Sequence, residues 1–131
     1  MKNSLEKITE EIIREALKGS SVDLRCTQGN ICVPIVNRLY RKMKANILFE
    51  HIGVDEDWIC DGHHRYIASV LADYSIGRKP SLRTSGHSVI DWKSVVFDDG
   101  DWDTPAKIAM LNERDAFYNK TTIQYIEDLL K

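Results

Sequence analysis

The sequence predicts an α+β fold, with a small mixed sheet and helices at both ends of the chain. Apolar residues recur at helical spacing over residues 3–18 and 104–130, whereas short alternating or β-branched segments occupy much of residues 22–97. The length of 131 residues fits one domain, since domains usually contain about 100–200 residues. We therefore expect a single domain over residues 1–131, with its core at about residues 22–97.

The first half of the chain is predicted to contain two helices and three strands. Asn3 is a candidate N-cap because Glu6 follows three residues later, as in a capping box. Pro34 suits the first turn of the second helix, where its missing N–H is not needed. The predicted elements are a helix over 3–18, a strand over 22–26, a turn over 27–30, a helix over 34–45, and strands over 47–52 and 58–60.

The second half is predicted to begin and end with helices. Asp103 or Thr104 is expected to cap the helix whose first turn contains Pro105. Residues 98–101 are rich in Asp and Gly, which predicts a turn. The predicted elements are a helix over 63–73, strands around 81–84 and over 89–97, a helix over 104–118, and a last helix from Thr121 or Thr122 to residue 130.

Composition excludes several classes of protein. The chain has 18 Lys and Arg against 20 Asp and Glu, a formal net charge of −2, which argues against electrostatic coating of nucleic acid. It contains no apolar stretch of the roughly 18 residues that a membrane helix needs, and no apolar signal segment near its start. The three cysteines lack C-x-x-C spacing, which argues against a disulfide framework or a zinc site and favours a reducing cytoplasm. We therefore expect no membrane partner.

The pentapeptide Asp61-Gly62-His63-His64-Arg65 carries the main chemical signal. The predicted strand before it leads through a glycine into a helix, so free backbone N–H groups and the positive end of the helix dipole are available to an anion. Arg65 supplies a planar fork for two phosphate oxygens, and His63 and His64 can donate hydrogen bonds or transfer protons near neutral pH. Asp61 can orient a histidine, bind a metal ion or act as a base.

A purely structural interpretation of this pentapeptide is a turn followed by a capped helix with solvated side chains. Cations in a first helical turn are unfavourable unless an anion neutralises them, because that end of the helix dipole is positive. We therefore favour a phosphate site. Its expected phosphate-binding residues are Gly62, His63, His64 and Arg65, and its expected catalytic residues are Asp61, His63 and His64.

The surroundings of this pentapeptide resemble the ParB/sulfiredoxin superfamily. Its members show G-x-H-R or G-E-R-R where this chain has D-G-H-H-R, at the junction of a strand and a helix. The resemblance covers roughly residues 22–80 and includes a first strand over 22–27, a helix over 34–45, and strands over 47–52 and 58–60. It implies a ParB/sulfiredoxin-like fold in which the motif loop binds nucleotide phosphates through its arginine and histidine.

Departures from the superfamily pattern narrow the activity that the resemblance implies. Sulfiredoxins have their reactive cysteine where this chain has His63, and Cys60 lies on the preceding strand and is expected to face the core, so sulfinic-acid reduction is not expected. Partitioning ParB proteins continue into a helix-turn-helix and a dimerisation domain, for which 131 residues leave no room. Other members are small nucleases, kinases of free amino acids and ParB-like domains of bacterial polymorphic toxins. The D-G-H-H-R form and residues 101–107 most resemble the toxin domains.

Other charged and aromatic side chains are further candidates. The auxiliary residues considered for gripping a nucleotide or following a polynucleotide are Arg25, Arg78, Lys79, Arg83 and His87. A basic run on the second predicted helix is expected to be a solvated face, with a polynucleotide track as the alternative; it comprises Arg38, Arg41, Lys42 and Lys44. The acidic residues 98–103 fail the EF-hand pattern, because Thr104 and Met110 replace its glycine and its glutamate. The three tryptophans are expected to pack and not to stack on bases.

The sequence thus predicts a phosphate-handling enzyme that binds a nucleotide or a nucleic-acid phosphate at the D-G-H-H-R loop. The first hypothesis is a nuclease, a hydrolase that binds DNA or RNA, with toxin-like effector activity and a protein partner of the immunity or toxin type. The second is nucleotide-dependent phosphotransfer. The expected cofactors are Mg²⁺, with Asp61 as a ligand, and a nucleoside triphosphate. A non-catalytic module that binds a nucleotide or a protein is the alternative.

Overall fold

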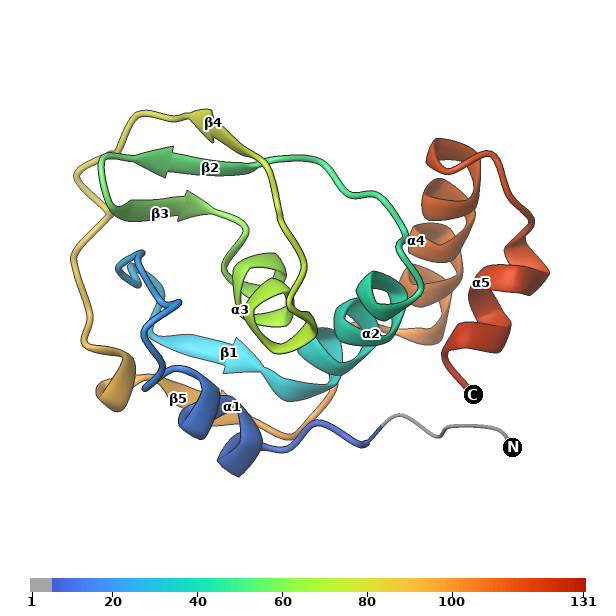
Figure 1. The fold of residues 1–131 in the computed structure, drawn as a ribbon, viewed down its shortest axis with the longest axis horizontal. Helices are drawn as coiled ribbons and strands as arrows, with labels where there is room; N and C mark the ends of the chain where they lie inside the picture. The colour runs from blue at the N-terminus through green and yellow to red at the C-terminus, as the bar shows by residue number, and fades with distance from the viewer. Residues whose placement is uncertain (1–5) are drawn as a thin grey trace.

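The computed structural model describes residues 6–131, in which short strands and helices are interspersed (Figure 1). The elements are α1 (Glu10–Ala16), β1 (Asn30–Cys32), α2 (Val33–Lys44), β2 (Ile52–Asp55), β3 (Trp58–Asp61), α3 (His63–Ala72), β4 (Arg78–Pro80), the 3₁₀ turn η1 (Trp92–Ser94), β5 (Val96–Asp98), α4 (Pro105–Tyr118) and α5 (Ile123–Leu129). The predicted α+β class is confirmed. Across residues 6–131, no helix has the length and apolarity needed to cross a bilayer.

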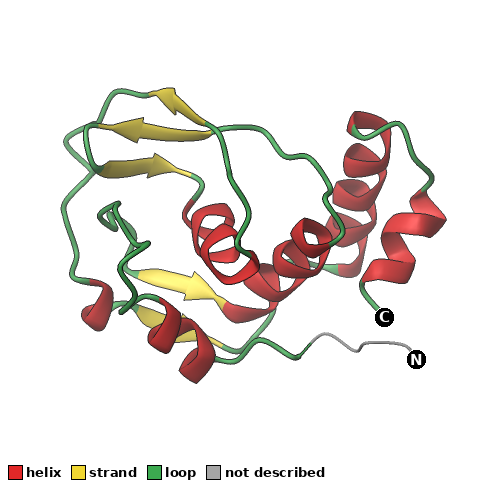
Figure 2. Cartoon of the chain, in the orientation of Figure 1, coloured by secondary structure: helices red, strands yellow, loops and turns green. Residues whose placement is uncertain are grey.

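The strands form two small sheets (Figure 2). In the first sheet the order is β3-β2-β4, with β2 antiparallel to β3 and parallel to β4. In the second sheet β1 pairs with β5 in parallel, so that Ile31 lies opposite Phe97. The first sheet is therefore mixed, as expected, but the single sheet that was predicted is divided into two, and no strand in residues 6–131 exceeds four residues.

Helix α3 joins the two parts of the core. Its Ile67, Ala68 and Ala72 pack in the cluster that contains Ile31 and Phe97 of the second sheet. Its Tyr66, which is 2% exposed, packs instead against Ile52 and Ile59 of the first sheet. Because one helix contacts both clusters, the start of α3 is held in a fixed position relative to both sheets. The motif loop lies at that end of the helix (Figure 1).

The two C-terminal helices attach to α2 through a mixed apolar and ionic contact. Ile47, Ala116 and Ile126 form a third buried cluster. Beside it, Lys42 of α2 and Asp115 of α4 form an ion pair with a 2.7 Å N–O distance, and both residues are at most 5% exposed. The prediction that Lys42 belongs to a solvated basic face is therefore wrong, because the side chain is buried against an oppositely charged partner.

The helix predictions are largely confirmed. The structure has helices at Val33–Lys44, His63–Ala72, Pro105–Tyr118 and Ile123–Leu129, close to the expected ranges. The side chains of Thr104 and Thr122 cap the last two by accepting hydrogen bonds from the backbone N–H groups of Lys107 and Tyr125. The first helix is shorter than expected: its cap is Thr9, whose hydroxyl accepts from the N–H of Ile12. The predicted cap Asn3 lies outside the described residues.

Several strand predictions are wrong in position. Residues 22–26 are not a strand, because Arg25 and Cys26 form only isolated bridges, to Trp58 and Ile90. The turn expected over 27–30 ends where β1 begins. Three other predicted strands lie elsewhere. The strand expected over 47–52 begins only at Ile52, as β2, and the one expected around 81–84 is β4 at Arg78–Pro80. The strand expected over 89–97 is divided into η1 and β5.

Side-chain hydrogen bonds take up backbone groups in two of the segments that were expected to be strands. The side-chain amide of Asn119, the C-cap of α4, bonds both backbone polar groups of Leu48, which ties this segment to the end of α4 instead of to a neighbouring strand. Asp91 accepts a hydrogen bond from the N–H of Lys93 at 3.0 Å and thereby caps η1, which interrupts the strand expected over 89–97.

Candidate functional site

Gly62 is required where β3 turns into α3. Its backbone has a φ of 98° and a ψ of 34°, in the left-handed region that glycine adopts at little cost. A Cβ atom at this position would lie 2.6 Å from Cγ2 of Ile52 and 3.1 Å from Nη2 of Arg65. Both the conformation and the space therefore exclude a side chain, because the side chains of Ile52 and Arg65 pack directly against this glycine.

The first turn of α3 has unpaired backbone donors. No side chain caps the helix, and its first turn contains no acidic residue. The first intrahelical bond runs from the N–H of Tyr66 to the carbonyl of Gly62, at 2.8 Å. The N–H groups of His63, His64 and Arg65 accordingly have no hydrogen-bond acceptor among residues 6–131. This end of the helix offers three donors and a positive dipole to an anion.

His63 is a buried acceptor of a backbone hydrogen bond. The residue is 5% exposed, and its Nε2 accepts from the N–H of Thr27 at 2.9 Å. Burial lowers the pKa of His63 to about 4, helped by repulsion from His64 and His87 and opposed by the charge of Asp61. The ring is therefore neutral at pH 7, and since Nε2 accepts, its proton resides on Nδ1.

His64 has the same role one residue later. Its Nε2 accepts from the N–H of Cys32 at 3.0 Å, and the edge of its ring meets Trp102 with 5.4 Å between centroids. Burial lowers the pKa of His64 to about 4, against the opposing charge of Asp103. Together with the preceding histidine, it ties the segment before α2 to the start of α3, and leaves Nδ1–H as the free donor.

Arg65 is anchored to the backbone that leads into β2. Its Nη1 donates to the carbonyls of Glu50 at 2.7 Å and His51 at 3.3 Å. Its Nη2 lies 3.3 Å from a carboxylate oxygen of Asp61, whose side chain is 69% exposed. These contacts leave part of the guanidinium, which has five N–H donors and is 20% exposed as a side chain, available to another acceptor.

The structure places the predicted auxiliary arginines in ion pairs. Arg78 forms two 2.8 Å hydrogen bonds with the carboxylate of Asp23, and Arg25 lies 2.9 Å from Asp57. Arg83 pairs with Asp55 at 2.7 Å and stacks over the ring of Trp58 at 3.7 Å. Carboxylate partners already satisfy these guanidinium groups, so they do not form one basic track beside the loop.

Lys79 and His87 differ in their distance from the loop. Lys79 lies on β4, paired with Gly53, and β2 separates that strand from Asp61 on β3. Two strand spacings put the two backbones about 10 Å apart. His87 is closer: its Nε2 lies 3.3 Å from the carbonyl of Cys60, and its Nδ1 accepts from the N–H of Thr84. Of the auxiliary candidates, His87 is brought to the end of β3 that carries the motif.

The acidic turn before α4 pairs with α2. Arg38 forms hydrogen bonds of 2.6 and 3.0 Å with Asp101 and a further 3.0 Å bond with Asp103. The side chain of Arg38 is 15% exposed, so its predicted place on a solvated face is also wrong. No group of three or more His, Cys, Asp or Glu side chains in residues 6–131 is arranged to hold a metal ion.

Comparisons with known proteins do not identify the chain. No protein-family model, curated protein or solved structure matches it. The interpretation of the site therefore rests on its own geometry.

Thr27 and Cys32 are site residues that the sequence did not indicate. Their backbone N–H groups hold the two imidazoles, and the hydroxyl of Thr27 also donates to the carbonyl of Ile59 at 2.5 Å. Both positions lie more than 30 residues before the histidines. A hydrogen bond between a side chain and a distant backbone group leaves no periodic pattern, so no sequence signal could have identified these partners.

Proposed function

We propose that the chain binds a phosphate group of a nucleotide or a nucleic acid at the start of α3. The observation that carries this proposal is the set of three uncapped N–H groups, of His63, His64 and Arg65, behind a glycine with a positive φ. Such a helix end attracts anions through its donors and its dipole. No acidic side chain within this first turn competes for its N–H groups, and the Asp61 carboxylate beside it pairs with Arg65.

Each side chain of the loop has a distinct part in this proposal. Arg65 supplies the full positive charge, held in place by the carbonyls of Glu50 and His51. His63 and His64 supply neutral Nδ1–H donors, since their Nε2 atoms accept backbone hydrogen bonds. Because both imidazoles are neutral, Arg65 carries the full positive charge of this first turn.

The proposed ligand class follows the fold that the motif resembles. We assign the chain a ParB/sulfiredoxin-like arrangement, because a strand, a glycine and a helix with H-H-R in its first turn occur in that order. Asp61 is one exposed carboxylate beside the loop, which fits a Mg²⁺ ion held jointly with the phosphates of a nucleoside triphosphate. When bound, the ion would neutralise phosphate charge. The free thiols of Cys26, Cys32 and Cys60 fit the proposed reducing cytoplasm.

Catalysis is a second level of the proposal. The first hypothesis for the reaction is a nuclease of toxin-like effector type, with an immunity-type protein partner. The second hypothesis is nucleotide-dependent phosphotransfer. Either reaction needs a proton acceptor near the phosphate. Asp61 is the candidate base, because its carboxylate is exposed next to Arg65, whereas the Nε2 atoms of both histidines are already engaged. A module that binds nucleotide or protein without turnover needs only the N–H groups and Arg65.

Thermal unfolding tests the binding proposal. The chain is melted with ATP, CTP, GTP, short DNA and short RNA, each with and without Mg²⁺. A ligand present at about 100 times its Kd stabilises the native state by about 2.7 kcal/mol, so the melting temperature rises with its concentration. If none of these compounds raises the melting temperature, the phosphate site is refuted.

Two arginine variants locate the binding. Arg65→Gln is expected to weaken the stabilising ligand at least tenfold, because it removes the cation beside the N–H groups. Arg25→Gln is the matched control, since Arg25 also pairs with one carboxylate, and it should leave the affinity unchanged. Equal effects of the two variants would contradict the assignment.

Hydrolysis separates the catalytic hypotheses from simple binding. The purified chain is incubated with plasmid DNA, RNA or the stabilising nucleotide, and products are followed over time. If Asp61 is the base, Asp61→Asn retains binding and loses turnover. Binding without turnover of any of these substrates would favour the non-catalytic module.

A further inference from the structure

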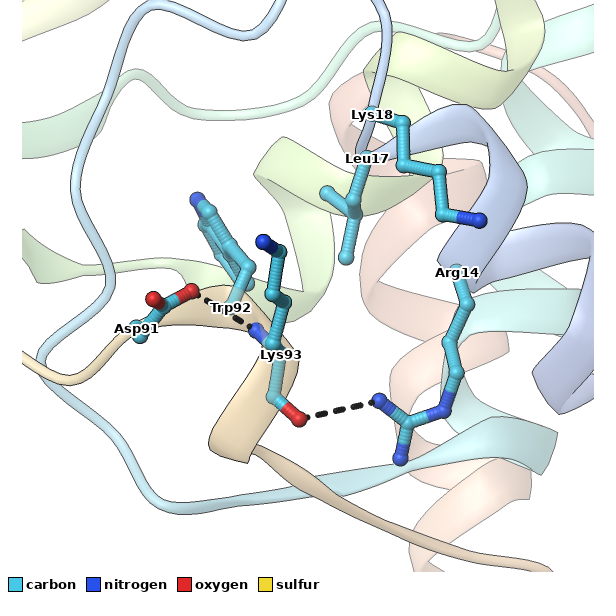
Figure 3. Close-up of a pocket in the computed structure, with 6 residues that line it drawn as sticks. All are labelled: Arg14, Leu17, Lys18, Asp91, Trp92 and Lys93. Atoms are coloured by element: carbon cyan, nitrogen blue, oxygen red, sulfur yellow. Dashed lines mark hydrogen bonds between the residues drawn. The ribbon is translucent and has the colours of Figure 1, made fainter.

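A separate cavity lies between the end of α1 and η1 (Figure 3). Its volume is about 230 Å³. It shares no residue with the motif loop, and its lining residues are Arg14, Leu17, Lys18, Asp91, Trp92 and Lys93. Pockets for drug-sized ligands usually measure about 300–1,000 Å³, so this cavity suits a smaller molecule.

The inner walls of the cavity are apolar and fixed. Leu17 and Trp92 are half-buried and both face the cavity (Figure 3). The indole N–H of Trp92 donates to the carbonyl of Leu24 at 3.1 Å, and the ring stacks on Tyr66 at 6.2 Å with an interplanar angle of 19°. Because its polar atom is satisfied elsewhere, the tryptophan presents an apolar ring face to a ligand.

The charged residues of the cavity are mainly basic. Three of its four charged side chains are cations, in a chain with a formal net charge of −2. Arg14 is held in the wall by Glu10 at 2.7 Å, by the carbonyl of Val95 at 3.0 Å and by stacking over Phe97. Asp91 is occupied as the cap of η1.

The two lysines are less constrained. The ammonium group of Lys18 lies 3.4 Å from Glu15. Both side chains are more than two-thirds exposed, so this ion pair contributes little to stability and does not hold the lysine in place. The ammonium group of Lys93 forms no ion pair with any residue in the described part of the chain. Two exposed lysine side chains therefore belong to the lining of the cavity, beside Leu17 and Trp92.

We propose that this cavity binds a small aromatic carboxylate. The ring would pack against Leu17 and Trp92, and the carboxylate would accept hydrogen bonds from the ammonium groups of Lys18 and Lys93. Burial of the ring favours binding through the hydrophobic effect, and the cations select an anion over a neutral molecule of the same shape. This proposal does not depend on phosphate binding at α3.

Benzoate is the probe, with benzamide as its neutral counterpart. In two-dimensional ¹H–¹⁵N spectra of the labelled chain, benzoate is expected to shift the indole N–H signal of Trp92 saturably and to leave those of Trp58 and Trp102 unchanged. Benzamide is expected to bind at least fivefold more weakly. Added salt should weaken benzoate binding, because the lysines are exposed. The absence of a saturable Trp92 shift, or equal affinity for the two probes, overturns the proposal.

Paired lysine variants test the assignment of the cations. The double variant Lys18→Gln/Lys93→Gln should weaken benzoate at least tenfold. Lys44→Gln/Lys107→Gln removes the same charge from exposed positions on other helices and should leave the affinity within twofold of the original. If both double variants weaken benzoate equally, the effect is one of net charge and the proposed site is wrong.

Discussion

Replacement of Gly62 by alanine should destabilise the fold more than the same replacement at a glycine in an exposed loop. The backbone at Gly62 has a φ of 98°, and the left-handed region costs a residue with a Cβ roughly 1–2 kcal/mol. The new Cβ would also lie 2.6 Å from Cγ2 of Ile52, which is completely buried and cannot move freely. Overpacking in a core adds about 1–3 kcal/mol. We therefore expect Gly62→Ala to lower the free energy of unfolding by about 2–5 kcal/mol.

Urea denaturation, monitored by circular dichroism, measures this change. The midpoint and the dependence of the free energy of unfolding on urea concentration are fitted for each variant. Gly86→Ala is the control, because a Cβ there would meet only the hydroxyl of Thr84 at 3.6 Å, an ordinary contact. The control should alter the free energy of unfolding by less than about 1 kcal/mol in either direction. A loss below about 1 kcal/mol for Gly62→Ala would refute the argument that the loop needs a glycine.

Two further predictions concern buried charge. The pKa of His63 and of His64 is about 4 in the fold, against an ordinary 6.5, so the unfolded chain binds more protons between these values and stability should fall as pH drops from 6.5 to 4. The expected loss is on the order of 3 kcal/mol per histidine. His64→Ala should therefore reduce the change of the free energy of unfolding between pH 6.5 and 4, measured by urea titration at each pH. If this pH dependence is the same in the variant, the imidazole of His64 is not held neutral by the fold. Lys42→Met should cost about 3–5 kcal/mol by leaving Asp115 buried without its partner. Lys42→Met/Asp115→Leu should regain most of that stability, and failure to do so would show that the pair itself is required.

The helices could be predicted from the sequence because their signals are local. The apolar stripe behind Pro34, and the threonines before the last two helices, act within a few residues of one another. The strands could not be placed as well, because each is only three or four residues long and is defined by a distant partner. Residues 22–26 alternate correctly, yet only Arg25 and Cys26 find bridge partners. Alternation alone does not provide those partners.

In the candidate site, too, local features could be predicted from the sequence and long-range contacts could not. The glycine and the helix start were predictable from the D-G-H-H-R segment and were found in the structure. The partners of His63 and His64 were not, because Thr27 and Cys32 reach them through the tertiary fold. The same applies to Arg38, whose carboxylate partners lie more than 60 residues later. Local pattern therefore identified where an anion is expected, and tertiary packing determined which donors remain free.

The most direct test of phosphate binding observes the three N–H groups themselves. In ¹H–¹⁵N spectra, the backbone signals of His63, His64 and Arg65 are followed while the nucleotide or oligonucleotide that gives the largest thermal shift is added. Binding at the start of α3 predicts that these three signals move together and saturate at one Kd, before any other group of signals. If that ligand saturates the protein while these three signals stay in place, the phosphate binds elsewhere and the account of the site is wrong.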